Sequence, residues 1–326
     1  MKKTIKILII FSLVCQFMIY PSQHVLAQGN KAMPVVEPIL SQKLRDPSIC
    51  TGPDGTYYLT GTTANNPAAG NDTTGWWYRN EGIRIWKSTD LKNWQPLGLI
   101  WSLDKDATWA KAWQKDNRGI RRRALWAPEM FYLKGTFWLT YSMNYRGCGL
   151  LKSTTGKPEG PYVDIKTDGP LTGNIDASLF KDDDGTIYWV YQNGMIAKMK
   201  DDMSGLAEEP RHLKPANDKQ VGFEGAFLTK FKGKYILICA ETNGQNPDRT
   251  YDCMAAISDN VYGPYGERYM AIPSGGHNMI FRDKKGNWMS TIFGSDGKCV
   301  LSETPGILPI KFDKDLKFHQ LMQTQK

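Results

Sequence analysis

Five residues with titratable side chains, each at the head of a similar stretch of sequence, could perform acid–base chemistry. They are Asp46, Glu129, Asp176, Glu224 and His277. Several carboxyl groups around one site suit the hydrolysis of a glycosidic bond, which needs one protonated acid at the leaving oxygen and one ionised base or nucleophile across the sugar. A further carboxylate beside the acid can keep its pKa high by like-charge repulsion. Position alone leaves open which acid has which role.

Metal binding is the competing chemistry for the same residues. A hard ion such as Ca²⁺ prefers oxygen ligands, which carboxylates near His277 could supply. The sequence holds no HExxH, GxSxG, P-loop or GxGxxG pattern in a convincing context. We therefore expect no required cofactor, and at most a structural Ca²⁺ near His277 that is bound through water.

The stretch behind each of these residues is typical of a β-hairpin. After Asp176 come a short apolar strand, the turn Asp184-Gly185 and an aromatic, β-branched strand that reaches Tyr191. Asp-Gly between two such runs favours a tight turn, because the turn needs residues that tolerate positive φ. The same arrangement recurs with turns at Asp54-Gly55, Lys134-Gly135, Lys232-Gly233 and Lys285-Gly286.

Five copies of this unit predict an all-β fold, a five-bladed β-propeller. The heads of the copies are about 50 residues apart, rising to roughly 80 after Asp46, which fits one four-stranded blade per copy plus one long insertion. The innermost strand of each blade lines a central channel, so we expect the five heads in register as a ring at one mouth. Strand caps or turn residues are the simpler interpretation of any single head. Clustered like charges are costly, however, and function is the usual reason that a fold retains them.

The N-terminus has the pattern of a secretory signal peptide. Three lysines within the first six residues precede an apolar run to about Tyr20, and the small residue Ala27 closes the segment. The run is too short and wrongly flanked for a membrane anchor. We expect a signal peptide over residues 1–27 that is cleaved near Ala27, a single propeller domain over 28–326, and export to the periplasm or the medium.

Charge and cysteine content argue against several other classes of protein. The formal net charge of the chain is +8, and the leader carries three of the lysines. An exported protein gives no reason to expect a nucleic acid as partner, and we expect neither membrane binding nor oligomerisation. Five cysteines follow the leader without CxxC spacing, which argues against a disulfide framework or a zinc site. One disulfide is compatible with export, but the sequence does not say which.

The segment from Asp104 to Arg123 stands out because Trp109 and Trp113 lie among seven lysines and arginines. Basic residues interleaved with aromatic ones can bind a nucleic acid or an acidic polysaccharide. A solvated loop with structural aromatic residues is the simpler interpretation. A sharper hypothesis is that Trp109 or Trp113 forms one wall of a sugar pocket.

Short motifs spread over nearly the whole mature chain, in the same order, resemble those of glycoside hydrolase family 43. They are Arg45-Asp-Pro-Ser-Ile49, Ser88-x-Asp-Leu-x-x-Trp94, Trp126-Ala-Pro-Glu129, Ile175-Asp-Ala-Ser-Leu-Phe-x-Asp-Asp-Asp-Gly185, Phe223-Glu-Gly225 and Gly276-His277. The resemblance implies a five-bladed propeller that hydrolyses chiefly α-L-arabinofuranosides and β-D-xylosides with inversion. One departure is Ala177, where many members carry proline.

The same resemblance implies a role for each residue that matches a motif. Asp46 would be the general base, Glu224 the general acid, and Asp176 the residue that raises the pKa of the acid and orients it. His277 resembles the histidine of the channel, often beside an ion or water. The substrate is expected to contact His277 and five more residues, which are Trp77, Trp109, Trp126, Glu129 and Phe223.

The leading hypothesis is therefore an exported, inverting exo-glycosidase that removes terminal α-L-arabinofuranosyl residues from a polysaccharide or oligosaccharide. A β-D-xylosidase or an exo-β-galactanase on the same scaffold is the alternative, because a few loops choose the sugar. A non-catalytic carbohydrate-binding propeller is a different class, and it predicts the loss of at least one of the three acids. A Ca²⁺-dependent structural propeller would unfold with chelators.

Overall fold

The computed structural model describes residues 36–64, 76–115, 119, 121–144, 146–242, 250–295 and 299–321. The expected signal peptide and its cleavage position lie outside the described residues. Contacts divide the chain into residues 1–31 and 32–326, and every described residue belongs to the second unit. Within its described part, no helix is long and apolar enough to cross a membrane.

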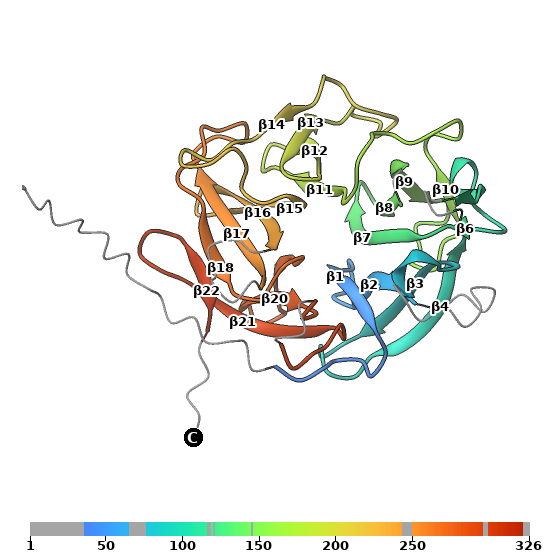
Figure 1. The fold of residues 1–326 in the computed structure, drawn as a ribbon, viewed down its shortest axis with the longest axis horizontal. Coiled ribbons are helices and arrows are strands. Elements are labelled where there is room, and N and C mark those ends of the chain that lie inside the picture. The colour runs from blue at the N-terminus through green and yellow to red at the C-terminus, as the bar shows by residue number, and fades with distance from the viewer. Residues whose placement is uncertain are drawn as a thin grey trace, which may run out of the picture. The chain divides into compact units, whose positions relative to one another are not determined.

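Five four-stranded antiparallel sheets surround a common centre, so the predicted five-bladed propeller is confirmed (Figure 1). Blade one is β1 (Leu44–Thr51), β2 (Tyr57–Thr63), β3 (Gly82–Ser88) and β4 (Gln95–Ser102); blade two is β7 (Leu125–Leu133), β8 (Thr136–Met143), β9 (Gly147–Ser153) and β10 (Tyr162–Asp164). Blade three is β11 (Ser178–Lys181), β12 (Ile187–Tyr191), β13 (Met195–Lys198) and β14 (Arg211–His212). Blade four is β15 (Glu224–Phe231), β16 (Lys234–Thr242), β17 (Tyr251–Ser258) and β18 (Tyr269–Ile272); blade five is β19 (Ile280–Arg282), β20 (Trp288–Ile292), β21 (Gly306–Phe312) and β22 (Phe318–Gln320).

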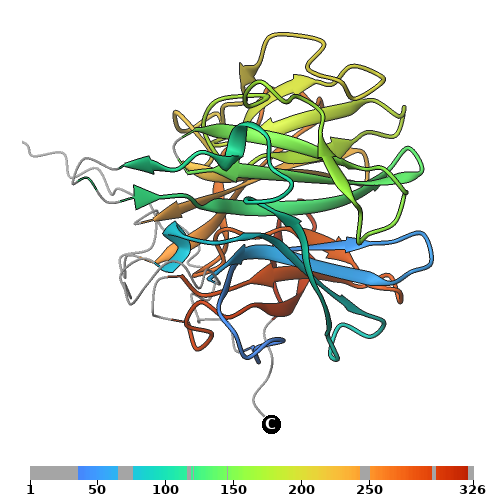
Figure 2. The same ribbon diagram turned by 90° about the vertical axis from the view of Figure 1, so that its right-hand side faces the viewer.

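Each pair of neighbouring blades encloses its own hydrophobic cluster, because alternate side chains of every strand face one of the two neighbours. Four clusters join blades one to two, two to three, three to four and four to five. The fifth cluster closes the ring, since Leu59 and Trp86 of blade one pack with Phe281 and Met289 of blade five. Figure 2 shows these first and last blades side by side. The one disulfide that the sequence left open is not formed, since Cys50, Cys148, Cys239, Cys253 and Cys299 are all free and buried.

The predicted hairpin turns lie between the first two strands of the blades. Their glycines have positive φ, for example +80° at Gly55 and +88° at Gly185, as the expected turns require. The polar heads stand at the opposite end of the innermost strands. The five innermost strands β1, β7, β11, β15 and β19 therefore start at the same mouth of the ring, and Figure 1 shows β1, β7, β11 and β15 around its centre.

The five heads are not in register, which corrects the expected ring of equivalent positions. Asp46 and Asp176 are equivalent, with φ of 53° and 60°, and Ala127 and Gly225 take this position in blades two and four. Strand pairing shows where the other heads lie. Glu224 is equivalent to Arg45 and Trp126, since these three residues pair with Ala240, Thr62 and Ser142, respectively, just before the bulge. Glu129 is equivalent to Ser48, since the two residues pair with Thr140 and Thr60 just after the bulge. A bulge in β1, β7 and β15 adds a residue to the inner strand before regular pairing resumes. Three different positions of the repeat therefore supply the titratable groups.

Candidate active site

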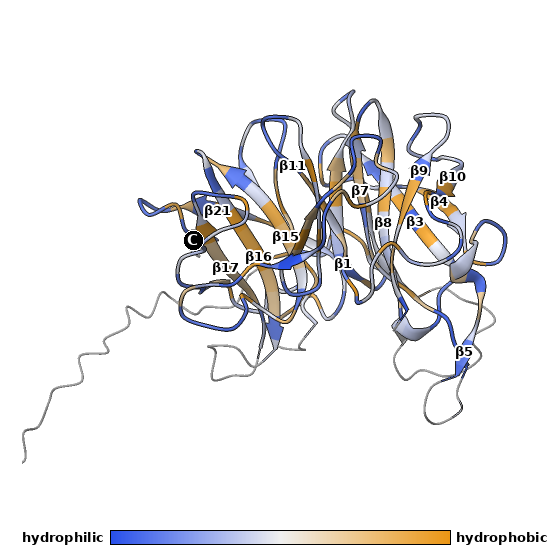
Figure 3. Ribbon diagram, turned by 90° about the horizontal axis from the view of Figure 1, so that it is seen from above, coloured by the Kyte–Doolittle hydropathy of each residue, from blue (hydrophilic) through white to orange (hydrophobic). Residues whose placement is uncertain are grey.

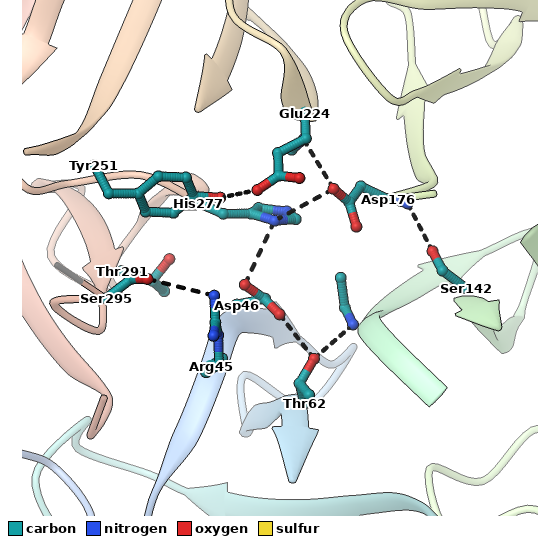
Figure 4. Close-up of polar contacts among 12 residues, drawn as sticks. Arg45, Asp46, Thr62, Ser142, Asp176, Glu224, Tyr251, His277, Thr291 and Ser295 are labelled. Carbon is teal, nitrogen blue, oxygen red and sulfur yellow. Dashed lines mark hydrogen bonds and ion pairs between the residues drawn. The ribbon is translucent and has the colours of Figure 1, made fainter. Parts of the chain in front are cut away.

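A cavity of about 250 Å³ lies at the mouth where the inner strands start. Its lining contains three of the predicted acids and the predicted histidine, and it comprises Arg45, Asp46, Thr62, Trp77, Trp126, Ile175, Asp176, Glu224 and His277. Figure 4 shows the carboxyl groups of Asp46, Asp176 and Glu224 directed toward the His277 ring. Side chains more than 230 positions apart along the chain thus meet in one small space.

Asp46 is held by a neighbouring strand of its own blade. Thr62 Oγ1 donates a hydrogen bond of 2.7 Å to Asp46 Oδ2 and accepts one of 2.7 Å from the Ala127 amide of blade two. Because the Ala127 amide can only donate, the Thr62 hydroxyl proton is directed to the carboxylate. The other oxygen, Oδ1, lies 3.6 Å from His277 Nδ1. Asp46 is thus an acceptor fixed in place from two sides.

Asp176 is the most deeply enclosed of the three acids that line the cavity. Its residue is 6% exposed, its own amide donates a 2.6 Å hydrogen bond to Ser142 Oγ, and Oδ2 accepts one of 3.1 Å from the Gly225 amide. Burial first, and then the charge of Asp46, raise the pKa of Asp176 to about 8. Aspartate is among the few side chains that tolerate its left-handed backbone, and such strain gathers at functional sites.

Glu224 is one residue before Gly225 and comes from the start of β15. Tyr251 Oη donates a 2.6 Å hydrogen bond to Glu224 Oε1. Burial first, and then the charge of Asp176, raise the pKa of Glu224 to about 7, although the bond from Tyr251 acts in the opposite direction. A carboxyl group with such a pKa keeps its proton in mildly acidic solution, as a general acid must.

His277 sits between two of the acids. Its Nδ1 lies 3.6 Å from Asp46 Oδ1 and 3.8 Å from Asp176 Oδ2, and the residue is 6% exposed. Gly225 makes room for it, since a Cβ on this glycine would lie 2.7 Å from the imidazole ring, and its φ is +67°. The glycine after Glu224 is therefore needed both for its backbone conformation and for the close approach of His277.

Glu129 and Phe223 lie behind the cavity and are not among its lining residues. Glu129 is 5% exposed and accepts a 2.7 Å hydrogen bond from Ser178 Oγ; burial raises its pKa to about 7. The Phe223 ring lies 6.3 Å from that of Tyr251 and packs in the same small cluster. The two residues thus support the site from outside the cavity, whereas the sequence predicted contact with the substrate.

An aromatic wall closes one side of the cavity. Trp126 Nε1 donates a 2.7 Å hydrogen bond to the carbonyl oxygen of Trp77. The Arg45 guanidinium lies 4.4 Å from the centre of the Trp77 ring and 5.4 Å from that of Phe293, and it forms an ion pair of 3.4 Å with Glu303. Trp77 and Trp126 therefore line the cavity, and their contact with a substrate stays a prediction.

Trp109 and Trp113 are not among the residues that line the cavity. The structure therefore does not support the hypothesis that one of them forms a wall of the sugar pocket. Trp109 begins the 3₁₀ turn η3 (Trp109–Lys111), and its ring stacks on that of Tyr141 at 5.7 Å against the cluster between blades one and two. Trp113 lies between the guanidinium groups of Arg121 and Arg123, at 4.9 and 4.5 Å. Hydrophobic packing and cation–π contact, respectively, hold them away from the cavity.

Four residues of the site were missed in the sequence. Arg45 precedes the predicted base and could have been found from that position. Thr62 and Ser142 are strand partners of Arg45 and Trp126, so their role follows only from knowing the register. Tyr251 starts β17, a strand whose sequence has no distinguishing feature.

The residues around His277 do not fit a directly coordinated ion. Among the described residues, no group of three or more His, Cys, Asp or Glu side chains is placed to hold a metal. Ca²⁺ takes six to eight oxygen ligands, whereas the two nearest carboxylates both face the imidazole nitrogen.

Comparison with known proteins places these features in a family. The model of glycosyl hydrolases family 43 matches residues 35–318. The chain is 28% identical to "Beta-D-galactofuranosidase xynD" of Aspergillus niger over 68% of its own length and 75% of the relative. It is 29% identical to a "Beta-xylosidase" of Xylanibacter ruminicola, over 44% of this chain and 56% of the relative. The alignment with a relative from Escherichia coli covers only 42% of the length of that relative.

The solved structures agree on the fold. An α-L-arabinofuranosidase from Clostridium thermocellum superposes with a TM-score of 0.67 at 22% identity, covering 86% of this chain and 93% of the other. A xylosidase/arabinofuranosidase from a compost metagenome gives 0.68 at 20% identity, with 89% and 98% covered. With the family model matched over nearly the whole propeller, this chain belongs to glycosyl hydrolases family 43.

Proposed function

We propose that the protein is an exported, inverting exo-glycosidase that releases terminal pentose residues, with α-L-arabinofuranosyl as the leading candidate. The observation that carries the proposal is the convergence of Asp46, Asp176 and Glu224 on His277 in a cavity of about 250 Å³. A non-catalytic propeller would have no use for three acids in one small cavity, where Asp46 helps to raise the pKa of Asp176, and Asp176 helps to raise that of Glu224.

The proposed reaction uses one acid for each proton. Glu224, protonated below about pH 7, gives its proton to the leaving oxygen as the glycosidic C–O bond breaks. Asp46 takes a proton from a water molecule whose oxygen forms the new bond to the anomeric carbon from the opposite face. The Thr62 hydroxyl orients the Asp46 carboxylate. Both carboxyl groups return to their starting states after they exchange protons with solvent.

Asp176 acts through Glu224 and is a positioning residue in this scheme. Whenever Asp176 is ionised, its charge opposes the ionisation of Glu224, so the two neighbouring carboxyl groups resist carrying charge together, and the Gly225 amide ties Asp176 Oδ2 to the residue next to the acid. Loss of the Asp176 charge would thus release the proton of Glu224 too early, and loss of its hydrogen bond would let the acid move.

The size of the cavity supports cleavage at a chain end. Sites for drug-sized molecules occupy about 300–1,000 Å³, so a cavity of about 250 Å³ suits a single sugar residue. A β-D-xylosidase is the second candidate, because relatives named beta-xylosidase match this chain. We further propose that the exported protein acts as a monomer on oligosaccharides or polysaccharides. Any Ca²⁺ near His277 would be held through water and have a structural part only.

A panel of aryl glycosides tests the function directly. The α-L-arabinofuranoside, β-D-xyloside, β-D-galactoside and β-D-galactofuranoside are incubated with the purified chain, and the anomer first released is identified by proton NMR. We expect release from the arabinofuranoside with inverted configuration. Release with retention would overturn the assignment of Asp46 as a base, and release from the xyloside alone would replace the sugar. A folded protein that binds a glycan and cleaves none would be a binding module.

A further inference from the structure

We propose that the surface beside the pocket binds an acidic glycan, so that the part of the substrate that leaves carries uronate carboxylates. The surface is formed by the exposed side chains of Lys111, Lys115 and Arg121, with the partly exposed Arg79 and the buried Arg122 at its inner edge. This set of five residues is called the basic ledge. The inference rests on the proposed glycosidase function and specifies the class of its substrate.

The basic ledge is continuous with the aromatic wall of the cavity. Trp126 lines the cavity, and the Tyr78 ring meets its indole at 5.7 Å. The Arg122 guanidinium in turn lies 4.2 Å from the centre of the Tyr78 ring. A path from the cavity to the first ledge cation thus runs through two rings in contact.

The backbone holds the two segments of the ledge together. Arg79 forms a parallel bridge with Arg123, and the Asn80 side chain exchanges two hydrogen bonds with the backbone of Leu125, of 2.6 and 2.9 Å. The short hairpin of β5 (Gln114–Lys115) and β6 (Arg121–Arg122) continues outward, and Figure 3 shows β5 projecting beyond the ends of the blade strands. The ledge therefore borders the mouth of the pocket and extends away from it.

The chemistry that the ledge offers is charge. Arg122 covers the Tyr78 ring, and Arg121 and Arg123 lie on the Trp113 ring, so the aromatic faces on which a neutral sugar would stack are already used. Lys111, Lys115 and Arg121 are exposed. Exposed ammonium and guanidinium groups recognise carboxylates.

Two described aspartates lie close to the ledge. Asp104 pairs with Arg123 at 2.8 Å, and this contact lowers the pKa of Asp104, which Lys111 of the ledge helps to lower as well. Asp106 accepts a 2.8 Å hydrogen bond from the Ser102 amide. The five cations of the ledge thus outnumber Asp104 and Asp106, the two aspartates of the same insertion that the structure describes.

The cavity and the ledge differ in charge, and a glycan with a neutral end and an acidic remainder would match both. The cavity suits one sugar residue and carries three acids, which repel a uronate, so the sugar that is removed is expected to be neutral. The rest of the substrate must lie outside the cavity, where the ledge is the adjoining wall. A neutral branch on a galacturonate- or glucuronate-bearing backbone satisfies both conditions.

The test compares one polymer in two forms. The acidic form has a galacturonate backbone with arabinofuranose-terminated branches, and the second form is the same polymer after reduction of its carboxyl groups. At low salt we expect kcat/KM to be about five- to tenfold higher for the acidic form, since each of three exposed ion pairs adds a small amount. At about 1 M NaCl, where charges are screened beyond ~3 Å, the preference should vanish. Equal kcat/KM for both forms at low salt would overturn the proposal.

Two triple variants with the same change of charge show whether the ledge is responsible. Lys111→Gln/Lys115→Gln/Arg121→Gln should abolish the preference while kcat/KM for a neutral aryl arabinofuranoside stays within about twofold. The control Lys200→Gln/Lys214→Gln/Lys311→Gln, on exposed positions of blades three and five, should keep the preference. Loss of the preference in both variants would indicate a general charge effect and contradict a ledge site.

Binding separates this inference from the proposed function. Calorimetric titration of the wild-type chain with polygalacturonate oligomers needs no turnover. Binding that the ledge variant lacks would support the ledge even if no arabinofuranoside is cleaved. Turnover of the aryl arabinofuranoside without any binding of the oligomers would retain the function and overturn the ledge.

Discussion

Tyr251 donates a hydrogen bond of 2.6 Å from its Oη to Oε1 of Glu224. The phenol is itself buried, with its ring 6.1 Å from that of Phe293, so it cannot easily turn away from the carboxyl group. The bond favours the ionised form of Glu224, whereas burial favours the protonated one. Tyr251 therefore fixes Oε1, leaves Oε2 to carry the proton, and limits how far the pKa of the acid rises.

Replacing this phenol should affect both rate and pH dependence. Tyr251→Phe keeps the ring and removes the hydrogen bond, so we expect kcat to fall about ten- to a hundredfold, the usual value of a hydrogen bond to a charged group. The alkaline limb of kcat/KM should move to higher pH, because the bond that lowers the pKa of Glu224 is lost. Tyr265→Phe is the control, since Tyr265 donates to the Val261 carbonyl away from the site. A lower kcat with an unmoved limb would make Tyr251 a structural residue only.

The wild-type enzyme should lose activity as the pH rises through about 7. The general acid must be protonated, and burial together with Asp176 raises the pKa of Glu224 to about 7. Asp176→Asn removes the repelling charge, so the pKa of Glu224 should fall and the alkaline limb should shift to lower pH. The pH profile of kcat/KM with an aryl glycoside measures both. An alkaline limb that stays in place in Asp176→Asn would contradict the coupling of the two carboxyl groups.

The two assigned roles differ in their dependence on the leaving group. Glu224→Gln should cost about 10²- to 10⁴-fold on a natural oligosaccharide, but far less on a dinitrophenyl glycoside, whose leaving group needs no proton. Asp46→Asn should lose activity on both substrates, because water must be activated in each case. Glu209→Gln, an exposed position, should behave as wild type. Equal losses of both active-site variants on both substrates would mean that the roles are wrong.

Local signals in the sequence were sufficient for the architecture. The Asp-Gly and Lys-Gly turns require positive φ, and the aromatic and β-branched runs after them form the second strand of each blade. Each hairpin is specified by residues close together in the chain, so five copies could be counted without a structure. The position of the three acids in one cavity followed from this count.

The register of the site could not be read in the same way. Glu129 resembles Asp46 as a polar head, yet it lies two positions further along the repeat. Asp46 lies within the bulge of β1, whereas Glu129 is the residue at which regular pairing resumes after the equivalent bulge of β7. Tertiary packing decided the place of Trp109 as well, since its contact with Tyr141 joins residues from separate elements. Such contacts leave no pattern in the neighbouring sequence.

Glu129 should make the stability of the propeller depend on pH. Its pKa is raised from 4.5 to about 7 by burial, so its contribution is fully present below the pKa of the unfolded chain and is lost as the pH rises through about 7. Glu129→Gln has no proton to lose, so relative to wild type it should gain roughly 3 kcal/mol of unfolding free energy between about pH 4.5 and 8, at about 1.4 kcal/mol per unit of pKa shift. Urea titrations at a series of pH values measure this difference, with Glu209→Gln as the exposed control. Asp176 and Glu224 contribute equally to the pH dependence of the unfolding free energy in wild type and variant. Only the difference in unfolding free energy between the two proteins therefore reports on Glu129. The prediction would be contradicted if the unfolding free energies of wild type and Glu129→Gln changed by the same amount between about pH 4.5 and 8. The Glu129 carboxyl group would then be ionised throughout this pH range in the folded protein. Its hydrogen bond from Ser178, which favours the ionised form, would outweigh the effect of burial.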